Sequence, residues 1–212
     1  MNKSIIRRPF TYTYNNVTLI LIGVTVLFYL FNELNPLSRA FCSLNVLCIT
    51  KGHYYWQFFT YMFTHGNLQH LLFNMLGLLF FGITIEKTLG SKEFILFYLL
   101  CGVLSGILSF LVYLLTASYN VFLMGASGAI YSVLFMYAVL FPRSKIYIWG
   151  ILPVPAPLLV ILYGGIEIFS HFFSNQSPIA HMTHLSGFLF AYVYIRIRVG
   201  LKPWKIWKNA YL

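Results

Sequence analysis

The feature that most constrains this chain is a set of long apolar runs that contain no charged side chain. Residues 94–115 and 127–141 are such runs, and only 8% of the 212 residues are charged. A soluble domain carries about 25% charged residues, whereas a helix needs about 20 apolar residues to cross the hydrocarbon core of a bilayer. Because the charges lie at the ends of the runs, the sequence predicts a polytopic membrane protein.

The apolar runs predict an all-α membrane protein with six transmembrane helices. One domain, residues 17–195, is expected between an N-terminal segment, 1–16, and a basic tail, 196–212. The six helices are expected at residues 17–31, 67–85, 94–115, 127–141, from Pro155 or Pro157 to 173, and 178–195. No small-residue cleavage site follows the first run, so we interpret it as a retained helix rather than a signal peptide.

The connecting segments are expected not to span the membrane. A polar loop, an aromatic interfacial stretch and a short charged turn are expected at residues 32–56, 57–65 and 86–93, respectively. Residues 146–154 should not span either, because Pro153 and Pro155 would break a helix. Trp204 and Trp207 are typical of an interfacial segment in the basic tail.

The positive charge is distributed unevenly about the predicted helices. Six spans put both termini on one side, together with twelve lysines and arginines, while Arg39 and Lys51 lie on the other side. Positive residues gather on the cytoplasmic side of a membrane. The pattern predicts cytoplasmic termini and an external loop before Ser127, and it explains the net charge of +10 without a nucleic-acid partner.

Three of the predicted helices carry polar side chains at a similar depth. They are His65, Asn67, His70 and Asn74 on the second helix, Ser127 and Tyr131 on the fourth, and His181 and His184 on the sixth. At about 1.5 Å per residue, all lie in the outer half of a hydrocarbon core about 30 Å thick. Polar groups at that depth are costly and usually functional, so we expect a water-filled pocket open to the outside.

Ser127 is a candidate nucleophile at the head of the fourth helix. A serine hydroxyl needs a base to take its proton, and His184 suits this role because imidazole titrates near neutrality. His184 shares a helical stripe with Gly187 and Ala191. Small residues allow close helix packing, so this stripe is expected to bring His184 to Ser127.

The chain contains no aspartate, which removes the third member of a Ser-His-Asp triad. The hypothesis is therefore a dyad of Ser127 and His184. Tyr131 is expected to orient the imidazole by stacking. Glu167 is the only acid well inside an apolar run; we assign it a structural role, with assistance to the base as the alternative.

Donors for an oxyanion are expected from the second helix. His70 and Asn74 are four residues apart and therefore lie on one helical face. Their side chains and the backbone N–H of Ser127 can hold a negatively charged oxygen that forms during acyl transfer.

Other interpretations of the polar clusters stay open. A serine in a membrane helix is more often a packing residue than a nucleophile. Histidines on two helices, His65 with His70 and His181 with His184, could instead hold a metal ion or a haem. That interpretation would leave Asn74 unexplained.

The cysteines predict no metal site. Cys42 and Cys48 share the first external loop, where a disulfide is possible, while Cys101 is expected to be a packing residue. None has the spacing of a metal-binding motif.

The polar clusters carry a family resemblance over nearly the whole chain. The sequence GASG at 125–128 resembles the Gly-x-Ser-Gly nucleophile motif of the rhomboid intramembrane serine proteases. HLLFN at 70–74 resembles their His-x-x-x-Asn oxyanion motif, and AHMTHLSG at 180–187 resembles their Ala-His-x-x-His-Leu-x-Gly stretch. EKTLG at 86–90 is also similar to the family pattern, so the chain is identified as a member of this family, of the bacterial type with a six-helix core.

The resemblance implies an enzyme, a serine endopeptidase with Ser127 as nucleophile and His184 as base. Its site residues would include His70, Asn74 and Gly125 of the two motifs. The implied partners are transmembrane protein substrates and the lipid bilayer, in the bacterial inner membrane, with no cofactor and no metal. A non-catalytic rhomboid-like protein that binds membrane helices is the alternative, and the oligomeric state stays open.

The family also implies roles for two connecting regions. The first external loop, 32–56, would lie partly in the membrane, and the helix at 157–173 would act as the lateral gate for substrate. Two positions depart from the family pattern. Trp56-Gln57 stands where Trp-Arg is common, and Ala191 replaces the second glycine of a Gly-x-x-x-Gly pattern.

Overall fold

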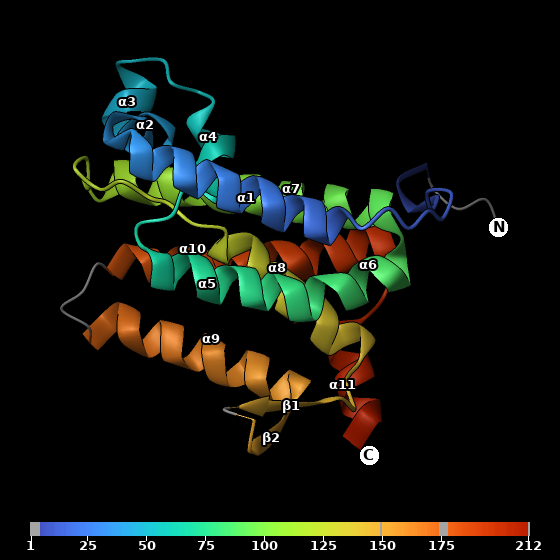
Figure 1. Cartoon of the computed structure of the whole chain (residues 1–212). Helices are drawn as coiled ribbons and strands as arrows, with labels where there is room; N and C mark the ends of the chain where they lie inside the picture. The colour runs from blue at the N-terminus through green and yellow to red at the C-terminus, as the bar shows by residue number, and fades with distance from the viewer. Residues whose placement is uncertain (1–4, 149, 174–177, 212) are drawn as a thin grey trace.

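The computed structural model describes residues 5–148, 150–173 and 178–211 as a mainly helical bundle (Figure 1). The longer helices are α1 (Val17–Leu34), α5 (Leu68–Gly77), α7 (Ser91–Leu115), α8 (Ser127–Leu140), α9 (Ala156–Phe173), α10 (Pro178–Tyr194) and α11 (Pro203–Tyr211). The shorter elements are η1 (Ile5–Arg7), α2 (Pro36–Cys42), α3 (Val46–Thr50), α4 (Gln57–Thr60), η2 (Tyr61–Phe63), η3 (Leu78–Gly82), α6 (Ile83–Leu89), β1 (Lys145–Ile148), β2 (Leu152–Pro155) and η4 (Ile195–Val199).

Within the described part of the chain, three helical stretches are long and apolar enough to cross a membrane. They are α1, α7 and the continuous stretch Leu68–Leu89, which is made of α5, the π-helical η3 and α6. Helix α8 and the segment Ala156–His171 of α9 are shorter apolar helices. These helices make the chain an integral membrane protein, and the count of six spans stays a prediction.

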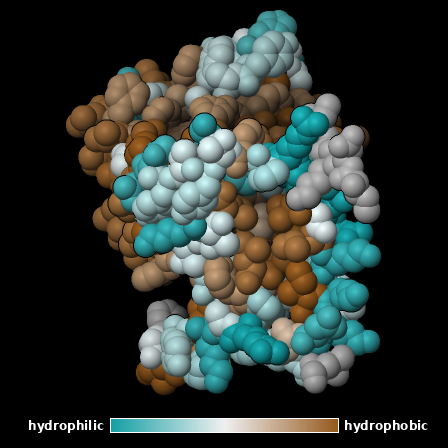
Figure 2. Space-filling view, turned by 90° about the vertical axis from the view of Figure 1, so that its right-hand side faces the viewer, coloured by the Kyte–Doolittle hydropathy of each residue, from teal (hydrophilic) through white to brown (hydrophobic). Residues whose placement is uncertain are grey.

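The N-terminal segment and helix α11 lie at the same end of the bundle (Figure 1). The Arg7 side chain donates from Nε to the carbonyl of Ile197 at 3.1 Å, which joins the two ends of the chain. Figure 2 views this end and shows hydrophilic residues along its right-hand and lower parts, with hydrophobic surface at the upper left and in the middle. Helices α2 and α3 lie at the opposite end.

The prediction of a charged turn at residues 86–93 is wrong. Helix α6 continues to Leu89 and α7 begins at Ser91, so Gly90 alone separates them. Gly90 has a φ of 85°, a backbone conformation that favours glycine, and its N–H donates to the Glu86 carbonyl at 2.8 Å. A single residue therefore reverses the chain, and both flanking glutamates are helical.

Glu86 is fully buried and binds the start of helix α1. Its carboxylate accepts hydrogen bonds from the backbone N–H groups of Val17 at 2.7 Å and Thr18 at 2.8 Å. The hydroxyls of Thr18 and Ser91 donate to the same carboxylate, at 2.8 and 2.5 Å. The first N–H groups of a helix lack partners within the helix, so Glu86 caps α1 from a distant part of the chain.

The aromatic stretch at 57–65 was expected at the membrane interface, but much of it is buried. Tyr61 and Met62 are each 1% exposed. Glycines on α7 make the room, since an added Cβ at Gly102 would lie 2.0 Å from Met62 Cε and one at Gly106 would lie 2.6 Å from Tyr61 Cε1. An aromatic run suits an interface and a core equally, so composition alone could not separate them.

The loop at 32–56 is anchored by Gln57, at the position where the resemblance to the rhomboid pattern led us to note a departure from arginine. Gln57 is fully buried; its Nε2 donates to the Phe41 carbonyl at 3.0 Å and its Oε1 accepts from Asn45 N–H at 3.1 Å. A glutamine thus secures the loop without a charge. Cys42 and Cys48, for which a disulfide was left open, are free cysteines.

Strands β1 and β2 pair as an antiparallel hairpin, with Lys145 opposite Pro155, which was not expected from the sequence. Helix α9 then begins at Ala156, between the two prolines considered as its start. In the tail, Trp207 Nε1 donates to the carbonyl of Ala138 on α8 at 2.9 Å, so α11 packs on the bundle, while Trp204 is 73% exposed.

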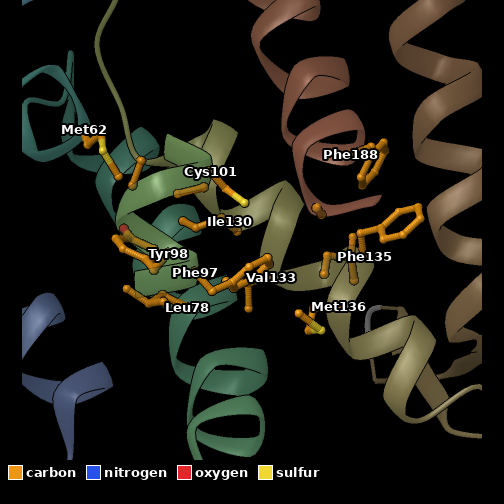
Figure 3. Packing of buried hydrophobic residues seen from close by; sticks show 14 of the residues in the cluster. Met62, Leu78, Phe97, Tyr98, Cys101, Ile130, Val133, Phe135, Met136 and Phe188 are labelled. Carbon is orange, nitrogen blue, oxygen red and sulfur yellow. The ribbon is translucent and has the colours of Figure 1, made fainter. Parts of the chain in front are cut away.

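Helices α7, α8 and α10 form the centre of the core (Figure 3). On α8, Phe135 faces Phe188 of α10, with ring centroids 5.9 Å apart. An added Cβ at Gly187 would lie 2.2 Å from the carbonyl oxygen of Gly128, and Ala191 is fully buried. The small residues therefore permit the close approach of α10 to the helix that begins with Ser127.

Candidate active site

Ser127 is the first residue of α8, and the loop before it has a conformation that requires glycine. Gly125 has a φ of 120° and its N–H donates to the Tyr61 carbonyl at 2.9 Å. The backbone N–H of Ala126 donates to Nε2 of the buried His65 at 3.5 Å. The turn is held from both sides, and it places Ser127 where helix N–H groups lack partners within the helix.

His184 lies within hydrogen-bonding distance of Ser127. Its Nε2 is 2.9 Å from Ser127 Oγ. The ring of Tyr131 stacks on the imidazole, with centroids 4.3 Å apart and planes at 11°. The candidate nucleophile, the candidate base and the stacking ring come from two helices, α8 and α10, that the small residues bring into contact.

Glu167 of α9 meets the far side of the same imidazole. Nδ1 of His184 lies 2.8 Å from Glu167 Oε1, and the hydroxyl of Tyr131 donates to the same oxygen at 2.5 Å. Nδ1 of His181 lies 2.5 Å from the other oxygen, Oε2. From the sequence, Glu167 was assigned a structural role, with assistance to the base as the alternative, and His181 was considered only as a metal or haem ligand. The contacts of both depend on helix rotation and on the approach of α9 to α10, which leave no mark in a motif.

The two candidate oxyanion residues lie on α5, whose start Asn67 caps by accepting from His70 N–H at 2.8 Å. The His70 ring lies against Gly125, since an added Cβ there would be 2.6 Å from its Cε1. Asn74 is 6% exposed, and its side-chain amide donates to the His70 carbonyl at 2.8 Å. Asn74 therefore has a fixed orientation, and its amide carries a second hydrogen.

The possible metal site was expected between the second and sixth predicted helices, but the structure groups metal-ligating side chains between α9 and α10. Among the described residues, Glu167, His181 and His184 form a group whose ligand atoms all lie within 4.8 Å of one another. His65 and His70 have rings 5.0 Å apart in a separate edge-to-face contact. Hydrogen bonds between the carboxylate and both imidazoles already account for the first group.

Comparison with known proteins agrees with this arrangement of motifs. A family model described as the rhomboid domain matches residues 52–200, which include every residue of the candidate site. The chain belongs to the rhomboid family.

Three relatives illustrate the range of this family. The mitochondrial RHOMBOID-like protein 12 of Arabidopsis thaliana is 31% identical over 84% of this chain and 56% of its own length. The mitochondrial presenilin-associated rhomboid-like protein of Rattus norvegicus is 31% identical over 82% and 42%. The rhomboid protease GlpG of Salmonella newport (strain SL254) is 30% identical over 65% and 48%. The rhomboid chain thus spans about half the length of the curated relatives it matches.

Proposed function

We propose that this rhomboid is an intramembrane serine endopeptidase that cleaves peptide bonds in or near transmembrane segments of other membrane proteins. The observation that carries the proposal is the 2.9 Å contact between Ser127 Oγ and His184 Nε2. A positioned base within this distance is what a serine needs to become a nucleophile. The GlpG relative is named a rhomboid protease, which supports the same reaction class.

The proposed reaction proceeds through an acyl-enzyme. Ser127 Oγ attacks the peptide carbonyl while His184 Nε2 takes its proton. His184 then protonates the leaving amine as the C–N bond breaks. A water molecule, deprotonated by His184, attacks the ester, and His184 returns that proton to Ser127 Oγ as the ester C–O bond breaks. His70, the Asn74 amide and the Ser127 N–H would stabilise the oxyanion, and the hydrolysis requires no cofactor and no metal.

The proposed membrane location is the bacterial inner membrane, with six spans and both termini in the cytoplasm. The imbalance of positive residues supports this orientation. A reporter enzyme that is active only outside the cytoplasm, fused after residue 211, should stay inactive, whereas the same reporter inserted in the loop at 116–126 should be active. The reverse pattern would contradict the orientation.

Cleavage of a labelled single-span protein in liposomes tests the enzymatic proposal. Ser127→Ala and His184→Ala should each abolish cleavage. Ser144→Ala and His53→Asn are matched controls away from the site and should cleave like the wild type; asparagine suits His53 because that residue has a φ of 59°. Cleavage retained by Ser127→Ala would refute the mechanism.

The same assay also tests the non-catalytic alternative and, separately, the proposed role of Asn74 in holding the oxyanion. A wild-type protein that binds the labelled helix but never cleaves it would favour a helix-binding function. Asn74→Ala should lower kcat by about 10²-fold, the usual cost of one oxyanion donor, with little change in KM. An unchanged kcat would remove Asn74 from the site.

A further inference from the structure

Glu167 is a buried carboxylate whose hydrogen-bonding partners all belong to the candidate site. It is 6% exposed and lies on an apolar helix between Ile166 and Ile168. A buried carboxylate without partners costs several kcal/mol, of order 2–7 for even a neutral polar group. Here the partners are two imidazoles and a phenol, and one imidazole is that of His184, the proposed base.

The contact with His184 decides which nitrogen of the imidazole carries the proton. A carboxylate only accepts hydrogen bonds, so Nδ1 of His184 must be the protonated nitrogen in its contact with Glu167. The neutral imidazole then has its free electron pair on Nε2, the atom that lies 2.9 Å from Ser127 Oγ. This is the tautomer that a general base for Ser127 needs.

Tyr131 constrains the same imidazole from a second direction. Its ring stacks on His184, and its hydroxyl donates to the carboxylate oxygen that also accepts from His184. The imidazole is therefore held on its face by the Tyr131 ring and at its edge by Glu167. The position of Tyr131 is in turn tied to that carboxylate.

We propose that Glu167 is a positioning residue that completes a Ser127–His184–Glu167 triad in this chain, which rests on the proposed function. When Ser127 Oγ forms its bond to the substrate carbonyl, its proton goes to His184 Nε2. Glu167 stays ionised, takes no proton and stabilises the imidazolium until the leaving amine receives the proton. A glutamate thus supplies what the absent aspartate would have supplied.

The triad depends on the packing of α9 against its neighbours. Glu167 is the one triad member on α9, whereas Ser127 lies on α8 and His184 on α10. Gly164 of α9 lies beside Phe188 of α10, whose ring would be in ordinary van der Waals contact, at 3.8 Å, with an added Cβ. Tyr163 of α9 lies near Tyr131 of α8, with ring centroids 6.1 Å apart. Separation of α9 from these two helices would leave His184 without its carboxylate.

Four variants test the positioning role in the liposome assay. Glu167→Gln keeps the shape and removes the charge; it should lower kcat by about 10²-fold and leave KM within about threefold. Glu167→Asp keeps the charge and should recover part of the lost kcat. His181→Gln should have a much smaller effect, and Glu33→Gln, an exposed acid paired with Arg39, should have none.

The comparison of Gln with Asp separates positioning from structural support. If Glu167 only holds α9 on α10, the isosteric Gln should retain more kcat than Asp, and thermal unfolding in detergent should follow the same order. That order would overturn the inference, as would an unchanged kcat in Glu167→Gln. If Ser127→Ala abolishes cleavage in the same experiment, the proposed function survives while the triad fails; if Ser127→Ala still cleaves, both fail.

Discussion

Two buried glutamates in this molecule have similar burial and opposite surroundings. Glu86 is fully buried and accepts from backbone N–H groups and hydroxyls, at the start of α1 and on Ser91. Glu167 is 6% exposed and accepts from two imidazoles and a phenol. The partners of Glu86 keep their protons at neutral pH, whereas imidazoles gain and lose theirs. The neighbours of a buried acid, rather than its burial, indicate whether it serves the fold or the chemistry.

The largest expected effect on stability comes from removing the carboxylate of Glu86. Glu86→Ala should lower the free energy of unfolding by about 3–5 kcal/mol, the usual cost of removing one partner from a buried charged network, because its four donors are left buried without an acceptor. Denaturant titration in detergent measures the loss, and kcat per folded molecule should stay within about twofold. A large fall in kcat of the folded fraction would contradict the contrast with Glu167.

A third buried acid extends the comparison. Glu93 accepts from Arg198 at 2.9 Å and 2.8 Å and from the Tyr194 hydroxyl, near the end of the bundle where the termini lie. Arg198→Gln should cost about 2 kcal/mol of unfolding free energy because it leaves a partly buried carboxylate without its cation. The double variant Arg198→Gln with Glu93→Gln should lose less than the sum of the two single variants; additive losses would show that the pair does not interact.

Tyr131→Phe tests the proposed role of Glu167 by removing a single hydroxyl group that donates to its carboxylate. The variant keeps the stacked ring and removes one hydrogen bond to Glu167, so we expect kcat to fall by about fivefold, equivalent to about 1 kcal/mol. Tyr131→Ala also removes the ring and should lower kcat further. Equal kcat values for the two variants would mean that stacking does not orient His184.

The smallest expected effect is that of a chelator. Glu167, His181 and His184 could in principle be metal ligands, but the proposed hydrolysis uses only side chains and water. Incubation with EDTA, followed by removal of the chelator, should leave the cleavage rate within about twofold. Loss of activity that added zinc restores would assign this cluster to a metal instead.

The helices and the central contact could be predicted from local patterns. Uncharged runs indicate α1, α7 and α8, Asn67 indicates the start of α5, and the small residues on α10 indicate close packing on α8. The proximity of His184 to Ser127 follows from that packing, because spacing along a helix fixes which side chains share a face.

Contacts between distant segments could not be predicted in this way. Nothing around Glu86 or Glu167 marks their partners, which depend on how whole helices are rotated and tilted against one another. The pairing of β1 with β2 was missed because both strands are four residues long and β2 contains two prolines. The burial of Tyr61 depends on glycines of α7 some forty residues later in the chain.

The capping of α1 by Glu86 has a consequence for synthesis. The carboxylate lies 69 residues after the N–H of Val17 that it binds. At about 5–20 residues per second, the ribosome needs about 3–14 s to add that length of chain. During this interval α1 has been made, but its first N–H groups must be satisfied by water or lipid headgroups. The first helix therefore acquires its final anchor only when the second long apolar stretch, Leu68–Leu89, has followed it into the membrane.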